Sequence, residues 1–124
     1  MKTGVENLIV YQKSFDLAMM IYEISKSFPH EEKYSLTDQI RRSSRAVCAN
    51  LAEAYCKRRY EAHFISKLSD SDMENTETQV WLNFALQCNY ISDDLCQELK
   101  DMSKEAGRLL DYMIHNPDKF TRRN

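Results

Sequence analysis

Apolar side chains recur at intervals of three and four residues in four long segments, which short polar stretches separate. This spacing places the apolar positions on one side of an α-helix. We expect helices at about residues 7–28, 35–59, 61–89 and 92–114, and a tail at 115–124. Pro29 and Pro117 follow the first and last helices, where proline disfavours continuation. The pattern predicts an all-α chain, and the short connections favour an antiparallel up-down-up-down four-helix bundle as a single domain, 1–124.

Two of the expected helices, 7–28 and 61–89, carry a second apolar stripe beside the one that would face a core. In a four-helix chain of 124 residues, the interior has little room for more than one stripe from each helix. We therefore expect the second stripes to meet another subunit in a homo-oligomer. The predicted interface residues are Leu8, Tyr11, Phe15, Tyr22, Ile65, Met73, Val80 and Phe84.

The core-facing seam of the third helix is polar at its middle, where Ser71, Asn75 and Thr78 stand in place of leucine or isoleucine. Two interpretations are open. In the first, the three side chains form a buried polar layer, which costs stability unless every group finds a partner but which fixes helix register and pairing. In the second, the helix is rotated at this point and the three side chains are exposed to water.

The segment that begins at Ser35 holds six of the chain's seventeen basic residues. Ser35 followed by Asp38 predicts a capping box at the start of its helix. The candidate nucleic-acid-binding residues are Arg41, Arg42, Arg45, Lys57, Arg58 and Arg59. A line of guanidinium groups along a helix is suited to phosphate contacts. The same arginines have the charge to pair with Asp70, Glu74 and Glu77, within the chain or between subunits, and both alternatives are open.

The charge balance argues against a protein that coats nucleic acid by bulk charge. The chain has 17 Lys and Arg against 19 Asp and Glu, for a formal net charge of −2. No apolar run approaches the ~18 residues of a membrane span, so no membrane partner is expected. The four cysteines form no paired motif and no secretory signal precedes them, so we expect reduced thiols and a cytoplasmic protein.

No arrangement of reactive side chains predicts a catalytic site. His30, His63 and His115 lie at no metal-ligand spacing with carboxylates or cysteines. A nucleophile motif and a glycine-rich phosphate loop are both lacking in the sequence. We therefore expect no enzymatic activity, no metal, no cofactor and no small-molecule substrate.

Several short motifs occur in a distinctive order over about residues 8–114. They are Tyr11-Gln12-Lys13, Phe28-Pro29, Tyr34 with Leu36, Gln39-Ile40-Arg41-Arg42, Asn50-Leu51-Ala52-Glu53, Glu77-Thr78-Gln79 and Tyr90-Ile91. In this order they resemble the bacterial four-helix-bundle family of 23S rRNA intervening-sequence proteins, also labelled S23 ribosomal proteins. The QIRR and NLAEA blocks are the most specific. The chain departs from the family at Ala54, where glycine is common, and at Asn75-Thr76, where Glu-Leu is common.

The resemblance implies an antiparallel bundle that assembles as a ring-like homopentamer. The accessory variability determinant of diversity-generating retroelements is a relative, which implies binding of nucleic acid and of a nucleic-acid enzyme. The leading hypothesis is a non-catalytic oligomeric scaffold that docks structured RNA or DNA, or an enzyme acting on them, through the arginines of the second helix. The alternative is a purely protein–protein or structural assembly in which these arginines are paired internally.

Overall fold

The computed structural model describes residues 4–121, and the regular elements within this range are all helical. Its four long helices are α1 (Ile9–Ser25), α2 (Leu36–Cys56), α3 (Glu61–Gln87) and α4 (Asp93–His115). Shorter elements are the 3-10 turns η1 (Val5–Asn7) and η2 (His30–Glu32), and α5 (Asp118–Thr121). The all-α prediction is confirmed. Within the described range, no helix has the length and apolar character needed to cross a membrane.

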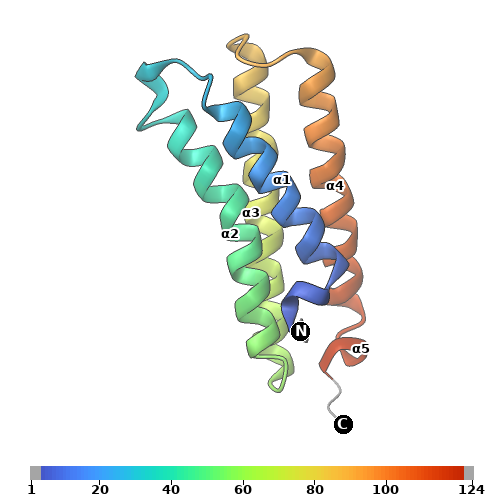
Figure 1. Cartoon of the computed structure of the whole chain (residues 1–124). Coiled ribbons are helices and arrows are strands. Elements are labelled where there is room, and N and C mark those ends of the chain that lie inside the picture. Colours follow the sequence, from blue (N-terminus) through green and yellow to red (C-terminus); the bar gives the residue numbers. More distant parts are fainter. Residues whose placement is uncertain (1–3, 122–124) are drawn as a thin grey trace.

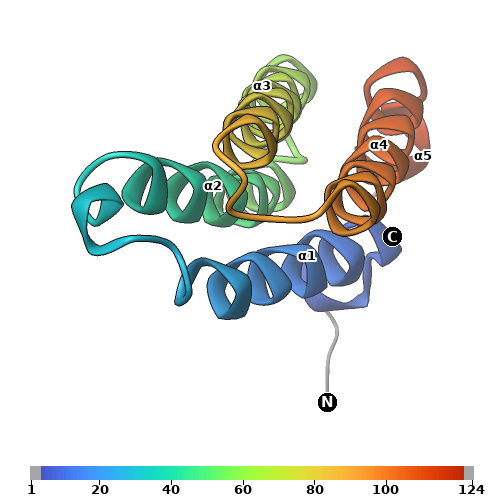
Figure 2. The same ribbon diagram turned by 90° about the horizontal axis from the view of Figure 1, so that it is seen from above.

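The four long helices surround a common core, and each packs against two others. α2 contacts α1 and α3, and α4 contacts α3 and α1. α1 and α3 therefore lie on opposite sides of the bundle, as the view along its length shows (Figure 2). Figure 1 shows the α1–α2 and α3–α4 connections at one end and the α2–α3 connection at the other. Helices that follow each other in the chain are thus neighbours in space.

The start of α2 differs from the prediction, because the capping box is not formed. Ser35 occupies the N-cap position, but its side chain bonds no helical N–H. Instead the Ser35 hydroxyl and the Leu36 N–H both donate to one carboxylate oxygen of Glu32, and the Tyr90 hydroxyl donates to the other. Asp38 is held in an ion pair on the outer surface of α2. The three donors lower the pKa of the Glu32 carboxyl, so an ionised group from the preceding loop caps the helix.

The connection from α3 to α4 depends on one left-handed residue. Asn89 has a φ of 63°. Its N–H bonds the Leu86 carbonyl, and the N–H of Tyr90 bonds the Ala85 carbonyl. This is the hydrogen-bond pattern of a Schellman ending, in which asparagine replaces the usual glycine. Ser92 then caps α4, its hydroxyl accepting the backbone N–H of Leu95 at 3.1 Å.

The chain after α4 was predicted to be a tail, and for its described part this is wrong. Asp118–Thr121 forms α5 directly after Pro117. The ring of Phe120 lies 6.4 Å from that of Phe64 and 6.3 Å from that of Tyr112, measured between centroids. Aromatic contacts at these distances hold the short helix against the end of the bundle. Residues 122–124 of the predicted tail lie outside the described range.

The core consists of two apolar clusters at different levels along the bundle. The first, at the end with the α1–α2 and α3–α4 connections, contains Leu17, Ile21, Phe28, Leu36, Ile40, Leu82, Ala85, Ile91, Cys96 and Leu99. The second contains Val10, Val47, Leu51, Ala54, Phe64, Leu68, Ala106, Leu110 and Met113. In every long helix, the buried residues between these two sets are small and polar: Ser14, Ser43, Ser44, Ser71, Asn75, Thr78 and Ser103. We call these seven residues the polar layer.

On the α2 side, the polar layer is held by hydrogen bonds from α3. The Ser71 hydroxyl donates to the backbone carbonyl of Val47 at 2.8 Å. The Thr78 hydroxyl lies 2.9 Å from the Ser43 hydroxyl. Ser71 and Thr78 are fully buried, so the interpretation of a buried polar layer is the correct one and the wet alternative is wrong.

On the α4 side, Asn75 makes a two-way contact with Ser103. Its Nδ2 donates to the Ser103 carbonyl at 2.8 Å, and its Oδ1 accepts from the Ser103 hydroxyl at 2.8 Å. Gln79 donates to the same hydroxyl at 3.0 Å. A Cβ atom on Gly107 would lie 3.3 Å from the Asn75 amide nitrogen. Glycine at this position therefore allows α4 to approach the asparagine closely.

α1 contributes to the polar layer without a hydrogen bond. Ser14 is 3% exposed, and its hydroxyl has no partner among the described residues. A buried hydroxyl without a partner costs stability. α1 is therefore joined to the layer by packing, whereas α2, α3 and α4 are joined by directed bonds.

We expect Asn75→Ala to lower the free energy of unfolding by about 2–3 kcal/mol, because it removes both bonds to Ser103 and leaves a void. The matched control is Asn83→Ala on the same helix, where the side chain is exposed and bonded to Lys100. The control is expected to change stability by less than about 0.5 kcal/mol. Urea unfolding followed by circular dichroism measures both. Equal midpoints for the two variants would contradict a stabilising role of the layer.

Candidate nucleic-acid interface and assembly faces

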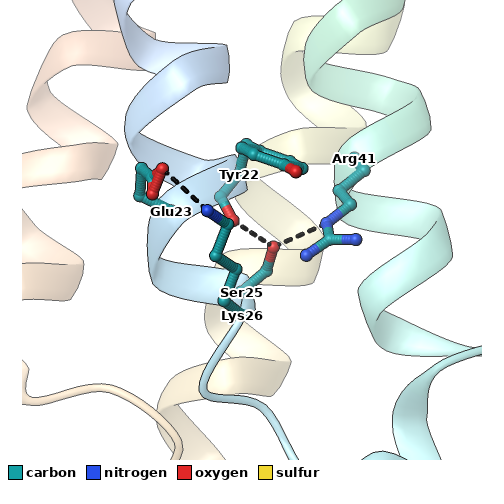
Figure 3. A network of polar contacts seen from close by, with 5 residues as sticks. All are labelled: Tyr22, Glu23, Ser25, Lys26 and Arg41. Carbon is teal, nitrogen blue, oxygen red and sulfur yellow. Dashed lines mark hydrogen bonds and ion pairs between the residues drawn. The ribbon is translucent and has the colours of Figure 1, made fainter.

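Arg41 reaches from α2 to α1 and is engaged with two residues of α1. Its Nε donates to the hydroxyl of Ser25 at 2.7 Å, and that hydroxyl donates to the Tyr22 carbonyl at 2.9 Å. The guanidinium carbon is 4.8 Å from the centroid of the Tyr22 ring. Figure 3 shows the arginine reaching across from α2 to this turn of α1. Because Ser25 is 2% exposed, Arg41 supplies a partner to a buried group and joins the two helices.

Tyr22 attracts two further cations. Arg45 lies one helical turn from Arg41, with its guanidinium carbon 5.5 Å from the Tyr22 centroid. Lys26 lies 4.8 Å from the same centroid and forms an ion pair with Glu23 at 3.0 Å (Figure 3). Cations over a tyrosine face are attracted by the negative face of the ring. The aromatic ring is therefore the centre of a basic patch between α1 and α2.

The remaining candidate cations divide between the outer surface and the C-terminal end of α2. Arg42 is exposed and pairs with Asp38 at 3.0 Å. Arg58 lies over the Tyr55 ring at 3.9 Å and donates to the Tyr55 carbonyl at 2.8 Å, which satisfies one group at the helix end. Lys57 and Arg59 are exposed and form no ion pair within residues 4–121. Five of the six candidates thus make two separate basic patches, and Arg42 stands apart in its ion pair with Asp38.

The alternative in which these arginines pair with the acidic residues of α3 is not realised within residues 4–121. Asp70 pairs with Lys67 at 3.6 Å. Glu74 and Glu77 have no cation partner in the described part of the protein, and burial together with the Glu77 and Asp70 charges raises the pKa of Glu74. The physical reason is placement, because Arg41 contacts α1 whereas α3 packs on another side of α2. Pairing between subunits stays a prediction.

The predicted assembly residues differ in exposure. Exposed members are Phe15 at 48%, Met73 at 55%, Val80 at 42% and Phe84 at 54%. Half-buried members are Leu8, Tyr11, Tyr22 and Ile65. Leu8, Tyr11 and Ile65 pack against the second core cluster, and Tyr11 also stacks on Phe15 at 6.1 Å. The strongest exposed apolar surface is thus on α3, with a smaller one on α1.

Several further large apolar or aromatic side chains are exposed, and no sequence pattern predicted a surface for them. Ile9 is 62% exposed and Tyr112 is 46% exposed, and both line an apolar cavity of about 340 Å³ between α1, α4 and α5. Tyr34 is 83% exposed and lines a groove of about 390 Å³ with Trp81 and Phe84. The cavity depends on α5, which was expected to be a tail, so no sequence pattern indicated it.

Few side chains among the described residues are arranged as metal ligands or as reactive thiols. Within residues 4–121, no group of three or more His, Cys, Asp or Glu is arranged to hold a metal ion. The four cysteines are free thiols. Cys48 and Cys96 are buried: burial raises the pKa of Cys48 to about 11 and also raises that of Cys96, so both behave as small apolar residues. Cys56 and Cys88 are exposed.

The fold and these surfaces define a small all-helical bundle protein with exposed aromatic and basic patches. The chain belongs to the 23S rRNA-intervening sequence protein family, whose model matches residues 6–112. It is also similar to the crystal structure of a protein of unknown function from the S23 ribosomal protein family of Bacteroides thetaiotaomicron VPI-5482. That match has a TM-score of 0.77 and 31% identity, and it covers 86% of this chain and 98% of that chain. No curated protein sequence matches the chain.

We expect Arg41→Ala to lower the free energy of unfolding by about 1–2 kcal/mol, because it removes the bond to buried Ser25 and the contact with Tyr22. Arg42→Ala is the matched control, since it removes an exposed ion pair worth less than about 0.5 kcal/mol. Denaturant unfolding of both variants measures the difference. If Arg41→Ala were no less stable than Arg42→Ala, the structural role of Arg41 would be refuted.

Proposed function

We propose that this chain is a non-catalytic scaffold that self-assembles and docks structured nucleic acid, or an enzyme acting on it, through the basic end of α2. One observation carries the proposal: a small bundle has exposed apolar side chains on two helices, α1 and α3, that lie on opposite sides. Exposed apolar surface of this kind is typical of interaction sites. The setting is the bacterial cytoplasm, which free thiols suit.

The proposed assembly is a ring-like homopentamer of antiparallel up-down-up-down bundles. Two different interaction surfaces on opposite sides of a subunit favour head-to-tail contacts, and such contacts close into a ring when the rotation between copies allows it. The number of five subunits in the proposed ring comes from the family resemblance. A ring also gives a reason for apolar side chains such as Phe15 and Phe84 to stand exposed on a single chain.

The proposed nucleic-acid contact is the patch formed by Lys57, Arg58 and Arg59, next to Tyr60. Lys57 and Arg59 are exposed, and Tyr60 is 55% exposed. Cations contact phosphates, and an exposed aromatic ring stacks on unpaired bases. Rotational symmetry places this patch at the same level in every copy of a ring. Several weak patches then act together, and this offsets the net charge of −2 of each chain.

A second candidate function is a purely protein–protein or structural assembly. The observation that favours it is the engagement of Arg41 and Arg45 with Tyr22, which uses two of the six candidate cations inside the bundle surface. In this case the α2 cations hold helices and subunits together. The binding experiment below separates the two functions.

We expect static light scattering of the purified protein at micromolar concentration to give the mass of several 14.6-kDa chains, about fivefold for the proposed pentamer. Dilution should lower this mass at a concentration set by the dissociation constant. A mass of one chain across the whole concentration range would contradict self-assembly.

We expect fluorescence anisotropy to detect binding of structured RNA or duplex DNA that weakens steeply as salt rises, because phosphate contacts release counterions. The double variant Lys57→Glu/Arg59→Glu should lower affinity at least about tenfold and reduce the salt slope by about 2. The matched control is Lys104→Glu/Arg108→Glu on α4, where both residues are exposed and outside any described ion pair. Equal losses for the two variants would indicate bulk charge, and no binding at low salt would favour the protein–protein function.

A further inference from the structure

We propose that the basic groove between α1 and α2 of one copy docks onto the acidic side of α3 of a second copy, with Arg45 facing Glu74 and Glu77. This inference rests on the proposed self-assembly and names the two surfaces that meet. The two surfaces are the basic groove, formed by Tyr11, Phe15, Tyr22, Arg41 and Arg45, and the acidic strip, formed by Met73, Glu74, Glu77, Val80 and Phe84.

The basic groove combines aromatic rings with cations that have no acid partner. Arg41 and Arg45 are stacked on Tyr22 and form no ion pair within residues 4–121. Phe15, 48% exposed, continues the aromatic surface about two turns from Tyr22 along α1. Arginine and tyrosine are among the side chains enriched in the energetic centres of protein interfaces. The groove therefore has the composition of an interface, and its unpaired positive charge is concentrated at Arg41 and Arg45.

The acidic strip has the matching composition with the opposite sign. Met73, Val80 and Phe84 are exposed, and they recur at helical spacing beside Glu74 and Glu77. Neither glutamate has a cation partner in the described residues, and partial burial, together with the charges of Glu77 and Asp70, raises the pKa of Glu74. A cation brought to this strip would relieve the repulsion between two carboxylates.

The signs of charge on the two surfaces determine which contact between copies is favourable. If the basic groove met a second basic groove, arginines would face arginines, and two acidic strips would likewise repel. Only the crossed contact places opposite charges together, which favours correct pairing and suppresses the wrong ones. Because α1 and α3 lie on opposite sides of the bundle, the crossed contact is head-to-tail and leaves one free surface of each kind for the next copy.

The two surfaces also lie at matching levels along the bundle. The bonds from Thr78 to Ser43 and from Ser71 to Val47 set residues 43–47 of α2 level with residues 71–78 of α3. Arg45 is therefore at the level of Glu74 and Glu77, although α2 separates them within one chain. A copy placed side by side, by rotation about an axis parallel to the bundle, keeps this level and brings the arginine opposite the glutamates.

The test compares Arg45→Glu and Glu77→Arg with the wild type by light scattering at physiological salt. Each substitution places like charges at the proposed contact, so we expect the concentration for half-assembly to rise at least about tenfold. The matched controls on α4 are Arg108→Glu and Glu98→Arg, both exposed and outside any described ion pair, which should assemble as the wild type does. Circular dichroism of every variant checks that the bundle remains folded.

The double variant Arg45→Glu/Glu77→Arg makes the test decisive. It exchanges the two signs, so the crossed contact is attractive again and assembly should return to within a fewfold of the wild type. A folded double variant that stays dissociated, or single variants that assemble normally, would overturn the proposed contact. In those cases the wild-type assembly would still stand, whereas a monomeric wild type would overturn the assembly itself.

Discussion

The structure depends on the hydrogen bonds that α3 makes halfway along the bundle. Ser71 and Thr78 bind α2, and Asn75 binds α4, so one helix sets the axial position of both of its neighbours. Apolar contacts alone permit a helix to slide by a turn, because any leucine fits against another. A buried polar group without its partner is costly, so only one register satisfies the layer. The two apolar clusters then fill the space above and below it.

The same helix register also determines which surface residues lie at the same level along the bundle. Arg45 and the glutamates of α3 are level because the layer fixes α2 against α3, and α1 completes the basic groove because Arg41 holds Ser25. The cations of α2 therefore have different roles along one helix. Arg41 joins two helices, Arg42 makes a surface ion pair with Asp38, and Lys57 and Arg59 stand exposed at the end. Cations that belong to one segment of the sequence are thus divided in space.

The sequence alone was sufficient to predict the elements that follow a regular helical spacing of apolar residues. The three- and four-residue spacing predicted four long helices, and the structure has them. The sequence was insufficient where a distant residue decides the outcome. Glu32 displaced the expected cap at Ser35 because Tyr90, far along the chain, also binds it. The pairing of arginines with α3 failed for the same reason: helical spacing gives the side of one helix, but not which neighbour lies there. α5 depends on the contact of Phe120 with Phe64.

The unpartnered hydroxyl of Ser14 has a consequence for how the bundle opens. Directed bonds across the polar layer link α2, α3 and α4, whereas α1 shares none of them. Local opening in proteins proceeds through cooperative units of unequal stability. The three bonded helices form the tighter unit, and among the four long helices we expect the backbone amides of α1 to exchange with solvent first. In the proposed assembly, a second copy docked along the basic groove would cover α1 and slow that exchange.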